Sequence, residues 1–78
     1  MRVLVTGAGG FIGSRLVEVL RARGRIADKR ISALALADRR LADVPASAVG
    51  LQGDLASGSM LQRIVDFRPD VVFHLAAV

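Results

Sequence analysis

A glycine-rich stretch, residues 6–13, lies where the chain changes from one structural pattern to another. The preceding residues 2–5 are apolar after the first and lack polar alternation, which is typical of a parallel strand covered on both faces. From Phe11 onward the apolar residues follow a helical period. We expect a helix over residues 11–23 whose apolar stripe is formed by Ile12, Leu16, Val17, Val19 and Leu20. The glycines therefore occupy a strand-to-helix turn.

The glycines of this turn have separate physical roles. Gly7 supplies the positive φ that a tight turn needs. Gly10 leaves room for an anion to approach the backbone, and Gly13 lets the helix pack closely on the sheet. The N–H groups of the first helical turn and the positive end of the helix dipole suit a pyrophosphate. The alternative is a tight turn that binds no ligand.

The spacing Gly-x-x-Gly-x-x-Gly after Thr6, with its Gly-Phe-Ile-Gly run, resembles the extended short-chain dehydrogenase/reductases. These are the NAD-dependent sugar epimerases, dehydratases and dehydrogenases. The resemblance implies NAD as the cofactor. It also implies that this turn contributes five residues to the cofactor site, which are Gly7, Gly10, Phe11, Ile12 and Gly13.

The chain has 78 residues, enough for one small domain. A member of the resembled family is similar to it only over its first quarter. We therefore expect residues 1–78 to be the N-terminal part of a dinucleotide-binding domain, from a fragment or a truncated reading frame. The second half of the sheet, the catalytic residues and the substrate domain would be absent. Such a chain alone should have no dehydrogenase activity.

Composition excludes several other classes. Apolar residues make up 53% of the chain, but no run reaches the roughly 18 residues of a membrane helix. Only three apolar residues separate Arg2 from Thr6, too few for a signal peptide. With no Cys and one His, neither disulfides nor a dedicated metal site is expected. These features favour a cytoplasmic protein without a membrane partner.

The net charge of +4 raises the hypothesis of nucleic-acid binding. Three Phe, with no Trp or Tyr, offer little surface for base stacking. We favour the alternative of a solvated basic edge with some attraction for a phosphorylated cofactor, and we predict no nucleic-acid partner.

The second strand should follow a polar connection, residues 25–30, after the helix ends at Gly24. This connection is longer than is usual in the family and is loosely similar to the erythronate-dehydrogenase branch. Residues 31–38 then form the strand, which ends at Asp38. An acidic residue there accepts hydrogen bonds from the adenosine ribose and would repel a 2′-phosphate, which favours NAD over NADP.

Two arginines leave the choice between NAD and NADP open. Arg39 and Arg40 follow Asp38 directly, and an arginine just after this strand can pair with a 2′-phosphate. Solvated side chains are the alternative for both, and Arg39 is kept as a candidate cofactor residue.

Residues 41–48 should be an irregular crossover with at most one helical turn, followed by a short edge strand at 49–52. In the resembled family, the next segment holds adenine, which implies this role for Asp54 and Leu55. An Asp after a strand is also an ordinary turn former and helix cap, so both readings of Asp54 stay open.

A capping box at Ser59 and Gln62 predicts the start of a second helix, and Pro69 predicts its end near Phe67. We expect its buried face to be formed by Met60, Leu61, Ile64 and Val65.

Residues 70–75 should form the fourth strand. In the family, the small-residue turn that follows lies against the cofactor's ribose and pyrophosphate, which implies contacts from Leu75, Ala76 and Ala77. His74 is the only His and could be an acid or base. The family pattern instead makes it a structural residue of the sheet, which we favour.

Together these elements predict an α/β fold, a partial Rossmann fold with parallel strand order 3-2-1-4 and the ligand crevice between strands 1 and 4. The predicted function is the NAD-binding portion of a sugar or sugar-acid epimerase, dehydratase or dehydrogenase. The family's catalytic Tyr and Lys cannot be located here, because the chain has no Tyr. A non-catalytic module that binds or senses the nucleotide is the alternative. The open edge of strand 4 raises a third possibility, a homo-oligomer.

Overall fold

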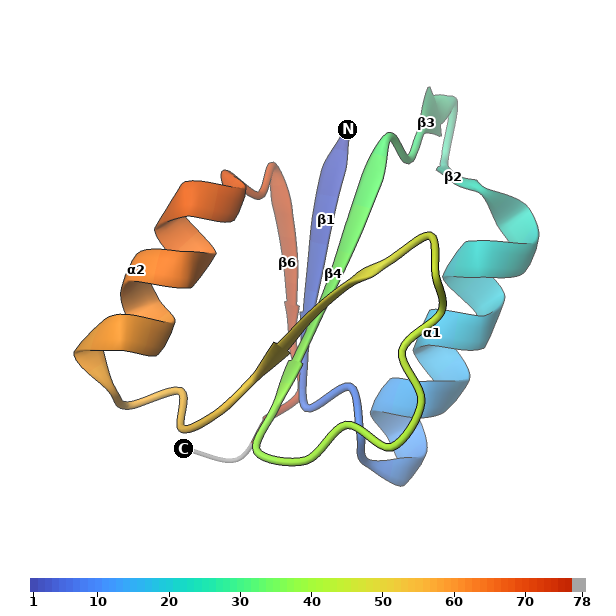
Figure 1. Cartoon of the computed structure of the whole chain (residues 1–78). Helices are drawn as coiled ribbons and strands as arrows, with labels where there is room; N and C mark the ends of the chain where they lie inside the picture. The colour runs from blue at the N-terminus through green and yellow to red at the C-terminus, as the bar shows by residue number, and fades with distance from the viewer. Residues whose placement is uncertain (77–78) are drawn as a thin grey trace.

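The computed structural model describes residues 1–76. A four-stranded parallel sheet has the order β5-β4-β1-β6 (Figure 1). Its strands and the two helices are β1 (Arg2–Thr6), α1 (Phe11–Arg23), β4 (Ala33–Asp38), β5 (Val49–Gln52), α2 (Gly58–Phe67) and β6 (Val71–His74). This arrangement confirms the predicted order 3-2-1-4.

The sheet has a hydrophobic core on each face, and Figure 1 shows α1 and α2 on opposite sides of it. On one face, strand residues such as Val3 and Val5 pack with Val17 and Leu20 of α1. On the other, Leu4, Ala35 and Leu51 pack with Met60 and Phe67 of α2. Because successive strand residues point to opposite faces, both sides of β1 are buried. This explains its uninterrupted apolar run.

The bounds of α1 agree with the prediction, but its buried stripe does not. Gly24 ends the helix with φ 68°, and its N–H donates to the Leu20 carbonyl at 2.8 Å. The buried helix residues are Gly13, Val17 and Leu20. Ile12 is 71% exposed and Val19 is 49% exposed. The helix is rotated so that Gly13, which has no side chain, lies against the carbonyl of Gly7.

Helix α2 ends at Phe67 as predicted, but its cap is different. The N-cap is Ser57, whose Oγ accepts a hydrogen bond from the Met60 N–H at 3.1 Å. Gln62 does not reach back to Ser59, because its side-chain amide donates to Asp66 Oδ1 at 2.9 Å. The predicted capping box is therefore wrong.

The buried face of α2 is also narrower than predicted. Met60 and Phe67 are buried and Ile64 packs against the same core, whereas Leu61 and Val65 are 59% and 58% exposed. Positions 60, 64 and 67 follow the helical repeat that faces the sheet, and positions 61 and 65 are turned about 100° away from it.

The two connections beside β4 differ in kind. Residues 25–30 contain two short antiparallel strands, β2 (Arg25–Ile26) and β3 (Lys29–Arg30), joined by a turn in which Ala27 has φ 54°. Residues 41–48 contain no helical turn. Among the described residues, neither helix is long and apolar enough to cross a bilayer.

Candidate functional site

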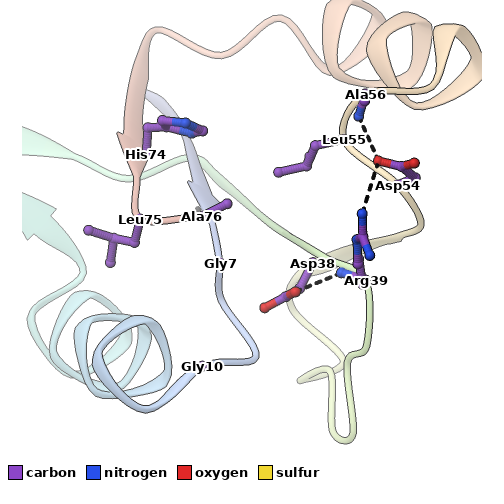
Figure 2. A pocket seen from close by; sticks show the side chains of 10 residues that line it. All are labelled: Gly7, Gly10, Asp38, Arg39, Asp54, Leu55, Ala56, His74, Leu75 and Ala76. Atoms are coloured by element: carbon purple, nitrogen blue, oxygen red, sulfur yellow. Dashed lines mark hydrogen bonds and ion pairs between the residues drawn. The ribbon is translucent and has the colours of Figure 1, made fainter. Parts of the chain in front are cut away.

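Parallel pairing brings the carboxyl ends of all four sheet strands to one edge, where the following loops surround a cavity of about 630 Å³ (Figure 2). Its volume lies within the usual range for small-molecule sites. The cavity is lined by Gly7, Gly10, Asp38, Arg39, Asp54, Leu55, Ala56, His74, Leu75 and Ala76. It lies at the switch point between β1 and β6, where the winding direction reverses.

Most of the predicted site residues are brought together here. Phe11, Ile12 and Gly13 are not among the lining residues. The side chains of Phe11 and Ile12 are 81% and 71% exposed, so these two residues face solvent in the described chain. Gly13 is buried. It packs so closely on the Gly7 carbonyl oxygen that a Cβ at this position would overlap it. Ala77 lies outside the described residues.

The glycine turn has the geometry that its sequence predicts. Gly7 has φ 71°, and a Cβ there would lie 2.7 Å from the Ala76 backbone nitrogen. The turns after β1 and β6 are therefore in direct contact at this glycine. Gly10 is the N-cap of α1, and no side chain caps this helix end among the described residues. The first turn of α1 also contains no acidic residue. The positive end of this helix is therefore left open beside the cavity.

Sequence reasoning missed Gly9. Its N–H donates to Asp38 Oδ2 at 2.8 Å, and a Cβ on Gly9 would overlap the Arg40 carbonyl oxygen. The glycine turn is thus tied to the end of β4. The adjacent pair Gly9 and Gly10 was a sequence signal for this contact. The three-residue glycine spacing includes Gly10 but not Gly9.

Asp38 is held by two backbone N–H groups. Besides Gly9, the N–H of Arg39 donates to Asp38 Oδ1 at 2.6 Å. Each carboxylate oxygen has two lone pairs, so both oxygens retain capacity for another donor. The carboxylate is therefore fixed at the cavity and able to accept hydrogen bonds from hydroxyl groups.

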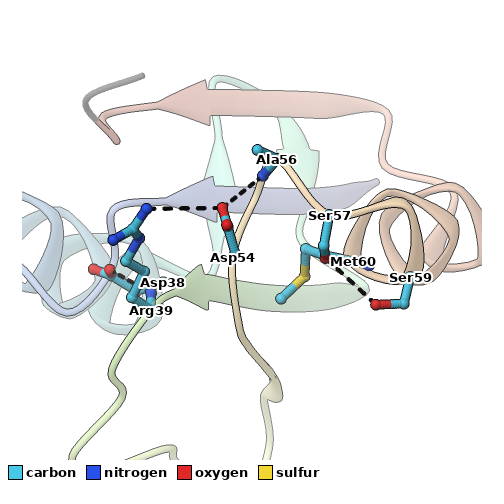
Figure 3. A network of polar contacts seen from close by, with 7 residues as sticks. All are labelled: Asp38, Arg39, Asp54, Ala56, Ser57, Ser59 and Met60. Atoms are coloured by element: carbon cyan, nitrogen blue, oxygen red, sulfur yellow. Dashed lines mark hydrogen bonds and ion pairs between the residues drawn. The ribbon is translucent and has the colours of Figure 1, made fainter.

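Asp54 organises the loop after β5. Its Oδ1 accepts a hydrogen bond from the Ala56 N–H at 2.9 Å and lies 3.9 Å from Arg39 Nη2 (Figure 3). Of the two structural roles considered for Asp54, the turn former is present, while the cap of α2 is Ser57. Ala56, which sequence reasoning did not single out, lines the cavity beside them.

His74 links the end of the edge strand β6 to the end of β1. Its Nδ1 lies 2.7 Å from the Oγ1 of Thr6, a buried hydroxyl that also accepts the Ala76 N–H at 3.3 Å. This contact gives His74 a structural role at the end of β6, although its side chain also lines the cavity. Within residues 1–76, no group of three His, Asp or Glu side chains is placed to hold a metal ion.

A parallel sheet with a glycine turn at its switch point and a carboxylate at the end of the adjacent strand is the arrangement of dinucleotide-binding α/β proteins. The sequence matches the NAD dependent epimerase/dehydratase family over residues 3–78, and the chain belongs to this family. The family resemblance inferred from residues 6–13 is therefore confirmed.

Individual relatives agree with this assignment. D-erythronate dehydrogenase of Cupriavidus necator is 37% identical over 100% of this chain and 26% of its own length. The structure of a nucleoside-diphosphate-sugar epimerase from Agrobacterium tumefaciens has a TM-score of 0.86 and 32% identity, over 100% of this chain and 24% of that one. UDP-glucose 4-epimerase of Thermus thermophilus, solved in complex with NAD, has a TM-score of 0.77 and 38% identity, with the same coverage. The chain thus spans about a quarter of the length of the curated relatives it matches.

Proposed function

We propose that residues 1–78 form the N-terminal part of the dinucleotide-binding domain of an NAD-dependent enzyme acting on a sugar or sugar acid by epimerisation, dehydration or oxidation. The observation that carries this proposal is the cavity at the switch point, where the uncapped start of α1 and the Asp38 carboxylate line one space. A helix N-terminus that binds anions lies beside a carboxylate that accepts hydrogen bonds from hydroxyl groups. This pair suits the pyrophosphate and the ribose of a dinucleotide.

The residues of the cavity would divide the cofactor between them. Gly7 and Gly10 would let the pyrophosphate approach the backbone, with N–H groups of Phe11, Ile12 and Gly13 turned toward it. Asp38 would accept hydrogen bonds from the adenosine ribose hydroxyls, and Asp54 with Leu55 would hold the adenine. Leu75 and Ala76 would line the side of the cavity opposite Asp54 and Leu55. The bound nicotinamide would supply hydride transfer.

The position of the Asp38 carboxylate supports NAD more than NADP. Asp38 is held in place by the N–H groups of Gly9 and Arg39, so its charge cannot move away from the ribose without breaking both bonds. A 2′-phosphate would meet this charge at close range, which is unfavourable.

The reaction itself requires groups beyond those found here. Proton transfer at a sugar carbinol in the family uses a Tyr, and this chain contains none. We therefore expect the 78-residue chain to bind cofactor without turnover. The intact mass of the native gene product would test the domain proposal, because a mass of 8.2 kDa would contradict it.

The proposal is tested by calorimetric titration of NAD and NADP into the wild type, Asp38→Ala and the control Asp43→Ala. Asp43 is exposed, lies in the connection that follows β4 and does not line the cavity. We expect Asp38→Ala to weaken NAD binding about tenfold, as for loss of a charged hydrogen bond, and NADP binding much less. Equal losses for the two cofactors would contradict the Asp38 assignment, and a wild type that binds neither would overturn the proposed function.

A further inference from the structure

Arg39 is a charged group of the cavity that the proposed function leaves without a role. It is the only Lys or Arg among the described residues that line the cavity. It follows Asp38 directly, so it stands where an arginine can recruit a 2′-phosphate. Whether Arg39 does so depends on what holds its guanidinium.

The guanidinium of Arg39 is directed across the site rather than toward Asp38. Figure 3 shows the side chain extending from the end of β4 to the loop after β5, where Nη2 lies 3.9 Å from Asp54 Oδ1. The Arg39 backbone is fixed at the other end by its N–H bond to Asp38 Oδ1, at 2.6 Å. Asp54 is itself anchored by the Ala56 N–H, at 2.9 Å. One carboxylate therefore fixes the Arg39 backbone and a second one engages its side chain.

We propose that Asp54 is a positioning residue for cofactor selectivity, acting by holding Arg39 away from the adenosine ribose. This inference rests on the proposed function of the same cavity. With Arg39 paired to Asp54, a 2′-phosphate would meet the negative charge of Asp38 without a free guanidinium to offset it. A 2′-hydroxyl needs only an acceptor, which Asp38 provides.

The size of the effect follows from exposure. The two side chains are 79% and 56% exposed, and exposed ion pairs are weak. Releasing Arg39 should therefore change the preference between the two ligands by about three- to fivefold, far less than a reversal of selectivity.

The experiment compares the affinities of 5′-AMP and adenosine 2′,5′-bisphosphate, measured by calorimetry. Asp54→Asn keeps an oxygen for the Ala56 N–H but removes the charge that engages Arg39. Asp43→Asn is the matched control, because it removes one negative charge from the connection after β4 without touching the cavity. Loss of an adenine contact in Asp54→Asn would weaken both ligands equally, so the ratio of the two affinities is the measured quantity.

We expect Asp54→Asn to shift this ratio toward the bisphosphate about three- to fivefold relative to Asp43→Asn. The shift should disappear in the double variant Asp54→Asn/Arg39→Ala when it is compared with Arg39→Ala. Equal ratios in Asp54→Asn and Asp43→Asn, or a shift that persists without Arg39, would overturn the inference while AMP binding upholds the proposed function. A wild type that binds neither probe would overturn both.

Discussion

The chain makes a strand-to-helix turn twice, and the two turns end differently. After β5, the Ser57 side chain caps α2 by accepting the Met60 N–H. After β1, Gly10 precedes α1 and brings no side chain to the corresponding position. Neither helix has an acidic residue in its first turn, so Ser57 is the difference between a helix end capped from within and one left open.

The comparison teaches that the first turn is built for close approach and the second for local stability. A Cβ on Gly13, in the first turn of α1, would overlap a backbone oxygen, whereas a Cβ on Gly58, at the start of α2, would meet nothing within 4 Å. The open helix end lies beside Gly10 at the cavity, and the capped one does not line it. An unsatisfied helix N-terminus at a cavity is suited to an anionic ligand.

The largest effect is expected from Gly13→Ala compared with Gly58→Ala. The first places a methyl group against the Gly7 carbonyl and should destabilise the protein by about 3 kcal/mol, because backbone must move to make room. The second should stabilise it by up to about 1 kcal/mol, since alanine is the better helix former. Urea denaturation followed by circular dichroism measures both. Similar midpoints for the two variants would show that α1 does not depend on close contact at Gly13.

A smaller effect, on binding, is expected from Gly10→Asp. Gly10 has φ −78° and the nearest atom to an added Cβ is 3.4 Å away, so the fold should accept the side chain. Its carboxylate would cap α1 and repel a pyrophosphate, and we expect the affinity for NAD to fall at least about tenfold.

Gly58→Asp is the control for Gly10→Asp, because it adds the same charge at the start of the other helix, outside the cavity. Calorimetric titration of NAD into both variants measures the two affinities. Equal affinities in the two would remove the case for an anion site at α1.

The smallest effect is expected from Ser57→Ala, which removes the cap of α2. Loss of an N-cap hydroxyl costs about 1 kcal/mol, and urea denaturation should show this decrease in the free energy of unfolding. Ser59→Ala is the comparison variant and should change stability by less than about 0.5 kcal/mol, because its exposed hydroxyl contacts Ser57 Oγ at 3.4 Å but does not itself cap the helix. The reverse ranking would restore the capping box at Ser59 and Gln62.

These two serines also show where prediction from sequence reaches its limit. Strand order and the glycine turn follow from the winding rules and from the spacing of Gly7, Gly10 and Gly13. The choice between Ser57 and Ser59 does not, because both precede the same apolar residues and only the direction of the entering chain separates them. The rotation of α1 was equally hidden, since it depends on the contact of Gly13 with Gly7 and not on the apolar period that included Ile12.

The candidate site shows the same division. Residues at the ends of strands could be predicted to meet, because parallel strands bring their carboxyl ends together. The contacts of Arg39 with Asp54 and of Gly9 with Asp38 could not, since each depends on the conformation of a loop, which the strand pattern does not determine. The β2–β3 pair was missed because Arg25, Lys29 and Arg30 carry no strand pattern.

The central position of β1 has a consequence for how the molecule is made. β1 is synthesised first, yet its two neighbours in the sheet are β4 and β6, and the register with β6 runs to His74. A growing chain must therefore keep one edge of β1, whose residues Val3, Leu4 and Val5 are buried in the folded sheet, unpaired until residue 74 has left the ribosome. Parallel pairing between distant segments is slow and exposes apolar surface to aggregation. Chaperone binding to a nascent chain should accordingly fall as β6 leaves the ribosome.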